Sequence, residues 1–236
     1  WNWKAGGAAV SNTDGSITSS VSANTDAGFS IVSWTAEGAI DTIGHGLSQK
    51  PELITIKDRD GADESWINGA DPIGWTKYLR LNSDAAENTS STVFNDASPS
   101  SSVFTVGDGF NDTQPIITYC FHSVEGYSKV GSYEGNGNAD GSFIYTGMAP
   151  AYIMVKRTDT ADNWAIYDSA RDTFNVRAKY LIADDAQAEA THSTAIVDFL
   201  SNGFKWRGAV NFGNNSSGTY IYLAFAESPF KYSNAR

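Results

Sequence analysis

The sequence of 236 residues contains one cysteine, Cys120, so a disulfide within the chain is impossible. Zinc sites built on two or four cysteines are excluded for the same reason. The chain also lacks an apolar run of the roughly 20 residues needed to cross a bilayer, and it opens without a basic segment followed by an apolar one. We therefore expect no membrane insertion, and a core that packing alone holds together.

Basic residues are scarce, with 16 Lys and Arg against 27 Asp and Glu and a formal net charge of −11. This balance argues against nucleic acid as a partner, because binding to a phosphate backbone depends on Lys and Arg. It also opposes docking on anionic lipid. Solubility is the simplest explanation of the charge, and cation binding is the alternative.

The chain is 41% hydrophobic and 13% aromatic, which is enough to build packed cores. Its strongest feature is an internal repeat, in which residues 46–60 (GLSQKPELITIKDRD) reappear as residues 147–159 (GMAPAYIMVKRTD). Further matches follow in the same order: Asp63 with Asp162, Trp66 with Trp164, residues 77–79 with residues 179–181, Phe104 with Phe204, and Phe121 with Phe225. Ordered matches with slowly drifting spacing indicate a duplicated module with loop insertions.

The repeat predicts three segments. Residues 1–27 are the end of a preceding copy followed by a polar connector, residues 28–125 are a first β module, and residues 126–236 are a second. Because residues 1–4 resemble the closing strands at 119–122 and 223–226, and because the chain starts without methionine, we expect a fragment that opens on the last strand of an earlier copy. Alternation from Ile17 to Val21 predicts one strand inside the connector.

Turn-forming residues interrupt the chain every eight to twelve positions, which is typical of sandwiches and barrels. Period-2 alternation places Ile117, Tyr119 and Phe121 on one face of a strand, and the apolar run at 151–155 predicts a central strand. Residues 197–206 predict a hairpin, and only residues 184–190 look briefly helical. The predicted fold is all-β, with two tandem β-sandwich modules of jelly-roll or lectin-like type.

An acidic turn is the candidate metal site. Asp58, Asp60 and Asp63 supply oxygen ligands at short spacing, which suits a hard cation such as Ca²⁺. The segment lacks a full twelve-residue calcium loop, and Asp and Gly are also ordinary turn residues. Ca²⁺ is the only cofactor that the sequence suggests.

Aromatic side chains are the candidate ligand contacts, because an exposed ring can pack against the apolar face of a sugar. Trp66 and Trp164 lie beside polar loops, and Trp75 lies in a turn-like segment without a counterpart in the second copy. We select Trp75 as the best surface contact. The alternative is that these tryptophans belong to the core, as most do in small β modules.

Asp168 and Arg171 are the remaining candidates, in the segment Tyr-Asp-Ser-Ala-Arg. They could form a binding site or, more simply, a salt-linked turn after a strand. No pair of carboxylates can be placed at a catalytic separation from sequence, and no nucleophile, zinc-protease or phosphate-loop motif is present. We predict no catalytic residues.

Five segments carry a resemblance to known proteins: residues 1–7 (WNWKAGG), 44–47 (GHGL), 156–159 (KRTD), 167–171 (YDSAR) and 224–230 (AFAESPF). Over nearly its whole length the chain resembles an uncharacterised tandem repeat of tail-fibre and related virion proteins of marine tailed phages. The resemblance implies an extracellular place in a virion appendage, contacts with other virion proteins, attachment to a host-surface receptor, and a homo-oligomer such as a trimer.

The leading functional hypothesis is a phage tail-fibre module that binds host-surface glycan or another receptor through loops. The first alternative is a purely structural spacer or virion decoration protein, and the second is a secreted polysaccharide-cleaving enzyme. Because the copies differ at residues 68–75 and 167–172, we expect a binding site to belong to one copy only.

Overall fold

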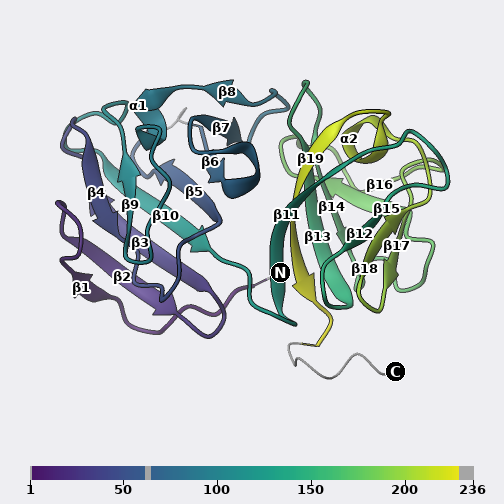
Figure 1. The fold of residues 1–236 in the computed structure, drawn as a ribbon, viewed down its shortest axis with the longest axis horizontal. Coiled ribbons are helices and arrows are strands. Elements are labelled where there is room, and N and C mark those ends of the chain that lie inside the picture. Colours follow the sequence, from purple (N-terminus) through teal and green to yellow (C-terminus); the bar gives the residue numbers. More distant parts are fainter. Residues whose placement is uncertain (1, 62–64, 229–236) are drawn as a thin grey trace. The chain divides into compact units, whose positions relative to one another are not determined.

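The computed structural model describes residues 2–61 and 65–228 (Figure 1). Strands make up 42% of the structure and helices 5%, in several antiparallel sheets, so the all-β prediction is confirmed. The chain divides into two compact units. Unit 1 contains residues 1–80 and 87–122, and unit 2 contains residues 81–86 and 123–236.

Unit 1 is built on an eight-stranded sheet in the order β1-β2-β3-β10-β5-β6-β7-β8. Its strands are β1 (Val10–Asn12), β2 (Ser19–Asn24), β3 (Phe29–Thr35), β5 (Leu53–Asp58), β6 (Ile67–Ala70), β7 (Lys77–Arg80), β8 (Asn88–Thr89) and β10 (Pro115–Phe121). A second, two-stranded sheet pairs β4 (Asp41–Gly44) with β9 (Val103–Val106). Two short helices complete the unit, η1 (Asp71–Ile73) and α1 (Ser91–Phe94).

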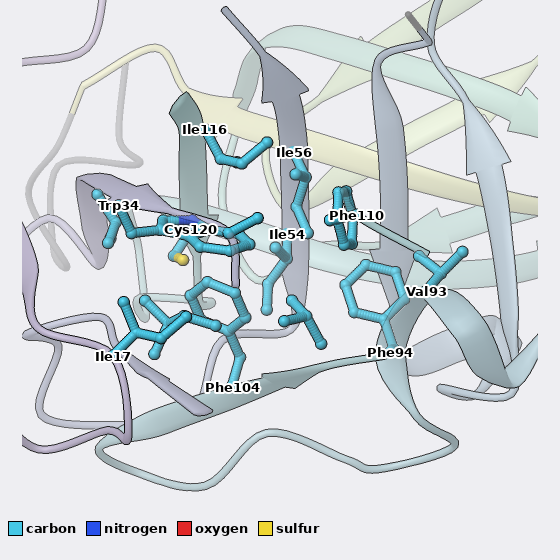
Figure 2. Packing of buried hydrophobic residues seen from close by; sticks show 14 of the residues in the cluster. Ile17, Trp34, Ile54, Ile56, Val93, Phe94, Phe104, Phe110, Ile116 and Cys120 are labelled. Carbon is cyan, nitrogen blue, oxygen red and sulfur yellow. The ribbon is translucent and has the colours of Figure 1, made fainter. Parts of the chain in front are cut away.

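The core of unit 1 lies between these sheets (Figure 2). Trp34 packs edge-on against Phe104 and Phe110, and its Nε1 donates a 2.9 Å hydrogen bond to Thr118 Oγ1. Burial raises the pKa of the Cys120 thiol to about 12, so this cysteine is a packing residue and not a nucleophile.

The face of β10 that packs into the core is not the face that its alternating apolar pattern suggests. Ile117, Tyr119 and Phe121 alternate with Ile116 and Cys120 along the strand, as the period-2 pattern predicts. The core cluster, however, takes Ile116 and Cys120 from the opposite face. Alternation identifies which residues share a face, but it does not identify which face meets the second sheet.

Unit 2 is built on a six-stranded sheet in the order β11-β19-β13-β14-β15-β16. Its strands are β11 (Ser128–Glu134), β13 (Pro150–Arg157), β14 (Trp164–Asp168), β15 (Lys179–Ile182), β16 (Ala190–Thr191) and β19 (Thr219–Ala226). A second sheet has the order β12-β18-β17, with β12 (Phe143–Tyr145), β17 (Val197–Leu200) and β18 (Gly203–Trp206). The helix α2 (Asn211–Asn214) precedes β19.

The two large sheets share a strand order. The run β3-β10-β5-β6-β7-β8 of unit 1 corresponds in sequence order to β11-β19-β13-β14-β15-β16 of unit 2. Residues that the repeat aligned occupy matching strands, such as 77–79 on β7 and 179–181 on β15. The central strand predicted at 151–155 is confirmed as β13, which lies between β14 and β19, and the hairpin at 197–206 is confirmed as β17 and β18.

The first 27 residues lie within unit 1. Residues 2–9 contain no strand, and the ring of Trp3 packs against Phe29 and Phe121 at centroid distances of 6.4 and 5.8 Å. The strand expected in the connector is present as β2, where Ser19 and Val21 are buried. The boundary between the two units lies between residues 122 and 123, whereas the sequence repeat predicted a boundary near Gly126.

The helix predicted at residues 184–190 is wrong, because this segment consists of bends and extended chain leading into β16. The Asp184 side chain accepts a 2.8 Å hydrogen bond from the Trp164 backbone N–H. A short polar side chain that binds backbone in this way competes with helix formation. In residues 2–61 and 65–228, no helix has the length and apolarity of a membrane span.

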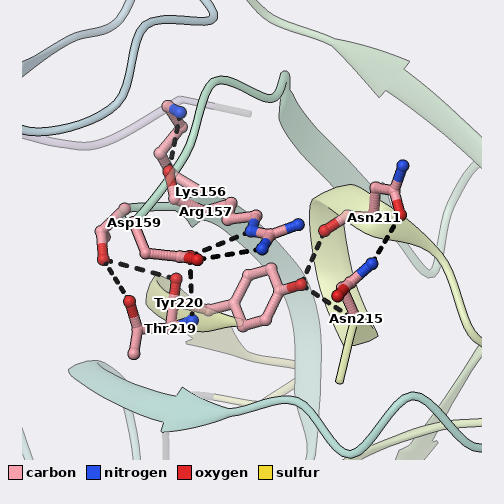
Figure 3. A network of polar contacts seen from close by, with 8 residues as sticks. Lys156, Arg157, Asp159, Asn211, Asn215, Thr219 and Tyr220 are labelled. Atoms are coloured by element: carbon pink, nitrogen blue, oxygen red, sulfur yellow. Dashed lines mark hydrogen bonds and ion pairs between the residues drawn. The ribbon is translucent and has the colours of Figure 1, made fainter. Parts of the chain in front are cut away.

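The turn after β13 is held by a polar network (Figure 3). Asp159 accepts two 2.9 Å hydrogen bonds from Arg157 and one of 3.1 Å from the Thr219 N–H. The Arg157 guanidinium lowers the pKa of Asp159 to about 2. The Tyr220 hydroxyl donates to the Asn211 carbonyl at 2.6 Å, which fixes α2 against β19.

Candidate functional site: an aromatic face on unit 2

Two of the predicted tryptophans are not on the surface. Trp75 is only 6% exposed, because it packs edge-on against Phe94 in the core of unit 1 and donates a 2.7 Å hydrogen bond to Asp71. Trp164 is 2% exposed at the start of β14. The surface position expected of Trp75 is therefore wrong, and neither ring has the exposure that stacking on a ligand requires.

Trp66 is the one predicted tryptophan with partial exposure. It directly precedes β6, and its ring stacks on Tyr119 with a centroid distance of 6.3 Å and an interplanar angle of 17°. Stacking on a neighbouring ring already covers one of its faces. Ligand binding by Trp66 stays a prediction.

The geometry of Asp168 and Arg171 is that of a salt-linked turn. Asp168 is buried, and its Oδ1 accepts hydrogen bonds from the backbone N–H groups of Ala170 and Arg171. Arg171 Nε lies 3.2 Å from Asp168 Oδ2, and Arg171 Nη1 lies 2.7 Å from Glu189. These groups satisfy one another, so the turn after β14 has a structural explanation that needs no ligand.

The acidic turn is brought together only in part. Asp58 is buried, and its oxygens accept from the Asp60 N–H at 3.0 Å and from Gln114 Nε2 at 2.8 Å. Asp60 is exposed, and Asp63 lies outside the described residues. Within the described part of the chain, no three His, Cys, Asp or Glu side chains gather as metal ligands. Calcium binding at this turn stays a prediction.

Exposed aromatic rings do occur, on the small sheet of unit 2. Phe143 and Tyr145 of β12 are 46% and 66% exposed, whereas Ile144 between them is in the core. We call the outward side of this sheet the aromatic face; it is formed by Phe143, Tyr145, Asp198, Leu200, Gly203 and Lys205. Two residues along a strand span about 7 Å, so the two exposed rings form a short apolar strip along β12.

The strand register explains why both rings are open. Phe143 pairs with Lys205 and Tyr145 with Gly203 across the β12–β18 ladder. A Cβ atom on Gly203 would lie 2.1 Å from the Ile144 carbonyl oxygen and 3.0 Å from the Phe143 ring. Gly203 is itself buried, so glycine at this position allows the Phe143 ring to lie close to the β18 backbone.

Charged groups border the aromatic face. Lys205 Nζ lies 2.9 Å from Asp140 Oδ1 and donates to the Gly141 carbonyl, also at 2.9 Å. The hydrogen bond from Lys205 lowers the pKa of Asp140, which is therefore ionised at neutral pH. Asp198 Oδ2 lies 3.3 Å from Arg207 Nε. The face thus combines an apolar strip with carboxylate and ammonium groups at its edge.

Comparison with protein families matches residues 1–229 to DUF7483, a domain of unknown function. The chain belongs to this family. No curated protein and no solved structure matches it. The aromatic face lies wholly within the DUF7483 match.

The corresponding sheet in unit 1 of this DUF7483 chain has no ring on its outward side, since its one ring, Phe104, is in the core. If Phe104 is aligned with Phe204, Thr42 and Gly44 of β4 stand where unit 2 has Phe143 and Tyr145. The N-terminal segment also covers β4, because Ile17 bridges to Ile43 and the Ser19 hydroxyl donates to the Gly44 carbonyl at 2.8 Å. Within the DUF7483 fold, the aromatic face is therefore a property of unit 2.

Sequence reasoning missed Phe143 and Tyr145. The alternation of Phe143, Ile144 and Tyr145 was the available signal, since period 2 places the two aromatics on one side. The signal is weak, because three residues make a short strand. The tryptophans were selected as ligand contacts by residue type alone, although a large ring is buried more often than it is exposed.

Proposed function

We propose that this DUF7483 chain is a glycan-binding module of a virion appendage, such as a phage tail fibre, and that it holds host-surface carbohydrate on the aromatic face of unit 2. The observation that carries the proposal is the pair of exposed rings, Phe143 and Tyr145, on the same side of β12 and opposite Lys205 and Gly203 of β18. Neighbouring exposed rings on one side of a sheet, unlike a single exposed ring, are typical of an interaction surface.

The chemistry of the face suits a sugar. The apolar side of a pyranose packs against the rings, and its hydroxyls can donate to the exposed carboxylate of Asp140 or accept from Lys205. A ligand that offers both an apolar side and hydroxyl donors therefore matches more of this face than a purely apolar or purely anionic ligand.

The virion placement rests on the resemblance of the sequence to tail-fibre repeats. We propose with it that the two units are tandem β-sandwich modules, since in each a large and a small sheet meet at one core cluster and the large sheets share a strand order. Contacts with other virion proteins and a trimeric assembly belong to the same proposal.

Binding to an array of surface glycans tests the function directly, with wild type compared against Phe143→Ala and Tyr145→Ala. Each substitution should weaken binding about tenfold, since burying the face of a ring contributes roughly 1 to 2 kcal/mol. Phe174→Ala is the matched control, because Phe174 is an 80% exposed ring of the same unit outside the aromatic face.

Loss of binding in all three variants, or in none, contradicts the assignment to the aromatic face. A folded wild type that binds no glycan but self-associates, with association lost in Tyr145→Ala, supports the structural-spacer alternative. New reducing ends on incubation with polysaccharide would instead indicate an enzyme.

A further inference from the structure

A second concave surface, the hydroxyl groove, lies in unit 1 and shares no residue with the aromatic face. Its volume is about 1000 Å³, the upper end of the range of small-molecule sites. It is lined by Ser11, Ser16, Ile17, Thr18, Ser19, Ser20, Ser33, Trp34, Thr35, Ala36, Glu37, Arg59, Asp112 and Pro115.

The groove exists because the neighbouring strands β2 and β3 separate at one end. Their ladder runs from Asn24↔Phe29 to Ser20↔Ser33 and ends there. Beyond that point the chain before β2 turns to the small sheet, where the Ile17 N–H donates to the Thr42 carbonyl at 3.2 Å. The chain after Ser33 instead stays beside β10. The space between the diverging segments is the groove.

Most polar side chains that line the groove are exposed and make no hydrogen bond within the described residues. Among the described residues, five lining hydroxyls make no hydrogen bond, those of Ser11, Thr18, Ser20, Ser33 and Thr35. The side chains of Glu37, Arg59 and Asp112 likewise form no ion pair or hydrogen bond within the described chain. The buried residues Ile17, Trp34 and Ala36 supply an apolar floor.

The charge of the lining disfavours an anionic ligand. Two carboxylates, Glu37 and Asp112, stand against one guanidinium, Arg59, on a chain whose net charge is −11. A phosphate or an acidic polysaccharide would meet net repulsion here. The ligand should therefore be neutral and rich in groups that both donate and accept hydrogen bonds.

An extended peptide fits the groove less well. The backbone of Ala36 is bonded toward β10, through Gln114 and Thr113, so only Thr35 presents its N–H and C=O to the open edge of β3. One residue of open edge is too little for strand addition, which uses a row of main-chain hydrogen bonds.

We propose that the hydroxyl groove is a second glycan subsite, which takes a neutral oligosaccharide over the floor of Ile17 and Trp34 and hydrogen-bonds it through the free hydroxyls, Arg59 and Asp112. The ligand class rests on the proposed glycan-binding function, but the residues and the unit are different. The chain therefore carries two carbohydrate sites of different type, one stacking and one hydrogen-bonding.

Titration of the whole chain, observed by ¹H–¹⁵N NMR, separates the two sites. The probes are neutral gluco-, manno- and galacto-oligosaccharides, added to about 10 mM, a range that detects even millimolar affinity. We expect shifts of the amides of Thr18, Ser20 and Thr35. Thr18→Trp should fill the groove and abolish these shifts, and Arg59→Ala should weaken binding about tenfold. The matched control is Thr25→Trp, at an exposed turn outside the groove.

The double variant Phe143→Ala/Tyr145→Ala keeps the two proposals distinct, since it should leave the groove shifts unchanged. Shifts confined to the aromatic face, or groove shifts that survive Thr18→Trp, overturn the groove proposal and leave the proposed function standing. Groove shifts without any response of the aromatic face overturn the assignment of that face instead.

Discussion

Lys156 is a fully buried lysine whose ammonium is held by backbone alone. Its Nζ donates to the carbonyls of Asp84, Arg157 and Asp162 at 3.1, 2.7 and 2.8 Å. Desolvation lowers its pKa from 10.5 to about 8, although the nearby carboxylates of Asp184, Asp162 and Asp84 oppose that shift. Burial therefore disfavours the charged form of Lys156 relative to its neutral form.

This pKa predicts a pH dependence of stability. Between pH 8 and 10.5 the unfolded chain keeps the proton on Lys156 that the folded chain has lost, so the free energy of unfolding should rise with pH in this window. The contribution amounts to at most about 3 kcal/mol. Urea unfolding from pH 7 to 11 measures it, as the difference between wild type and Lys156→Met.

Lys179→Met is the control, since Lys179 is exposed on β15, which is separated from β13 by β14. A difference between wild type and Lys156→Met that stays flat across the whole range would contradict the role given to burial of Lys156.

At the scale of elements, α2 is a single turn pressed against a buried ring. A Cβ atom added to Gly213 would lie 2.2 Å from Cη2 of Trp206, which is fully buried and donates its Nε1 hydrogen bond to the Tyr133 hydroxyl at 2.8 Å. Neither partner can move cheaply, because the Tyr133 hydroxyl in turn donates to the Gly213 carbonyl at 2.7 Å.

Gly213→Ala should therefore lower the free energy of unfolding by roughly 1 to 3 kcal/mol, the usual cost of overpacking a well-filled core. Denaturant unfolding measures the loss, and Ser216→Ala, at an exposed position just after α2, should change stability by less than about 0.5 kcal/mol. Equal losses of stability in the two variants would contradict this expectation, because they would mean that the Trp206 ring moves aside for the added methyl group at little cost.

The strands were the most predictable elements. The repeated pattern placed β13 centrally and β17 and β18 in a hairpin, because apolar runs and turn residues act locally. The helix predicted at 184–190 failed at a residue whose side chain binds distant backbone, the N–H of Trp164. Local propensity carries no information on such a partner.

At the scale of the molecule, the chain does not divide into its two units at a single position. Residues 81–86 leave unit 1 between β7 and β8 and belong to unit 2, where the Asp84 carbonyl accepts from Lys156 Nζ and from the Asp162 N–H at 2.8 Å. The sequence repeat gives a boundary between copies, but it cannot show that a loop of one copy completes the other unit.

Replacement of residues 82–85 by Gly-Ser-Gly-Ser should open the turn between β13 and β14. We expect faster hydrogen exchange at the Asp162 amide and its neighbours by mass spectrometry, because a flexible Gly-Ser loop no longer holds the carbonyl of residue 84 against the Asp162 N–H. Amides of the core strand β10 serve as the control and should keep their protection. Unchanged exchange around Asp162 would show that the contact with residues 82–85 does not determine the protection of this turn.

The sequence by itself determined the all-β class, the repeat and most strands, because these depend on period-2 alternation and turn residues. It also identified Asp168 and Arg171 as a possible salt-linked turn, which the 3.2 Å contact bears out. Only the tertiary structure decided which rings are open. Trp75 turns inward against Phe94, whereas Phe143 and Tyr145 face outward from β12, and exposure depends on which face of a strand the second sheet covers. The hydroxyl groove could not be foreseen either, since it is made by two strands that part, and parting is set by long-range pairing rather than by any local pattern.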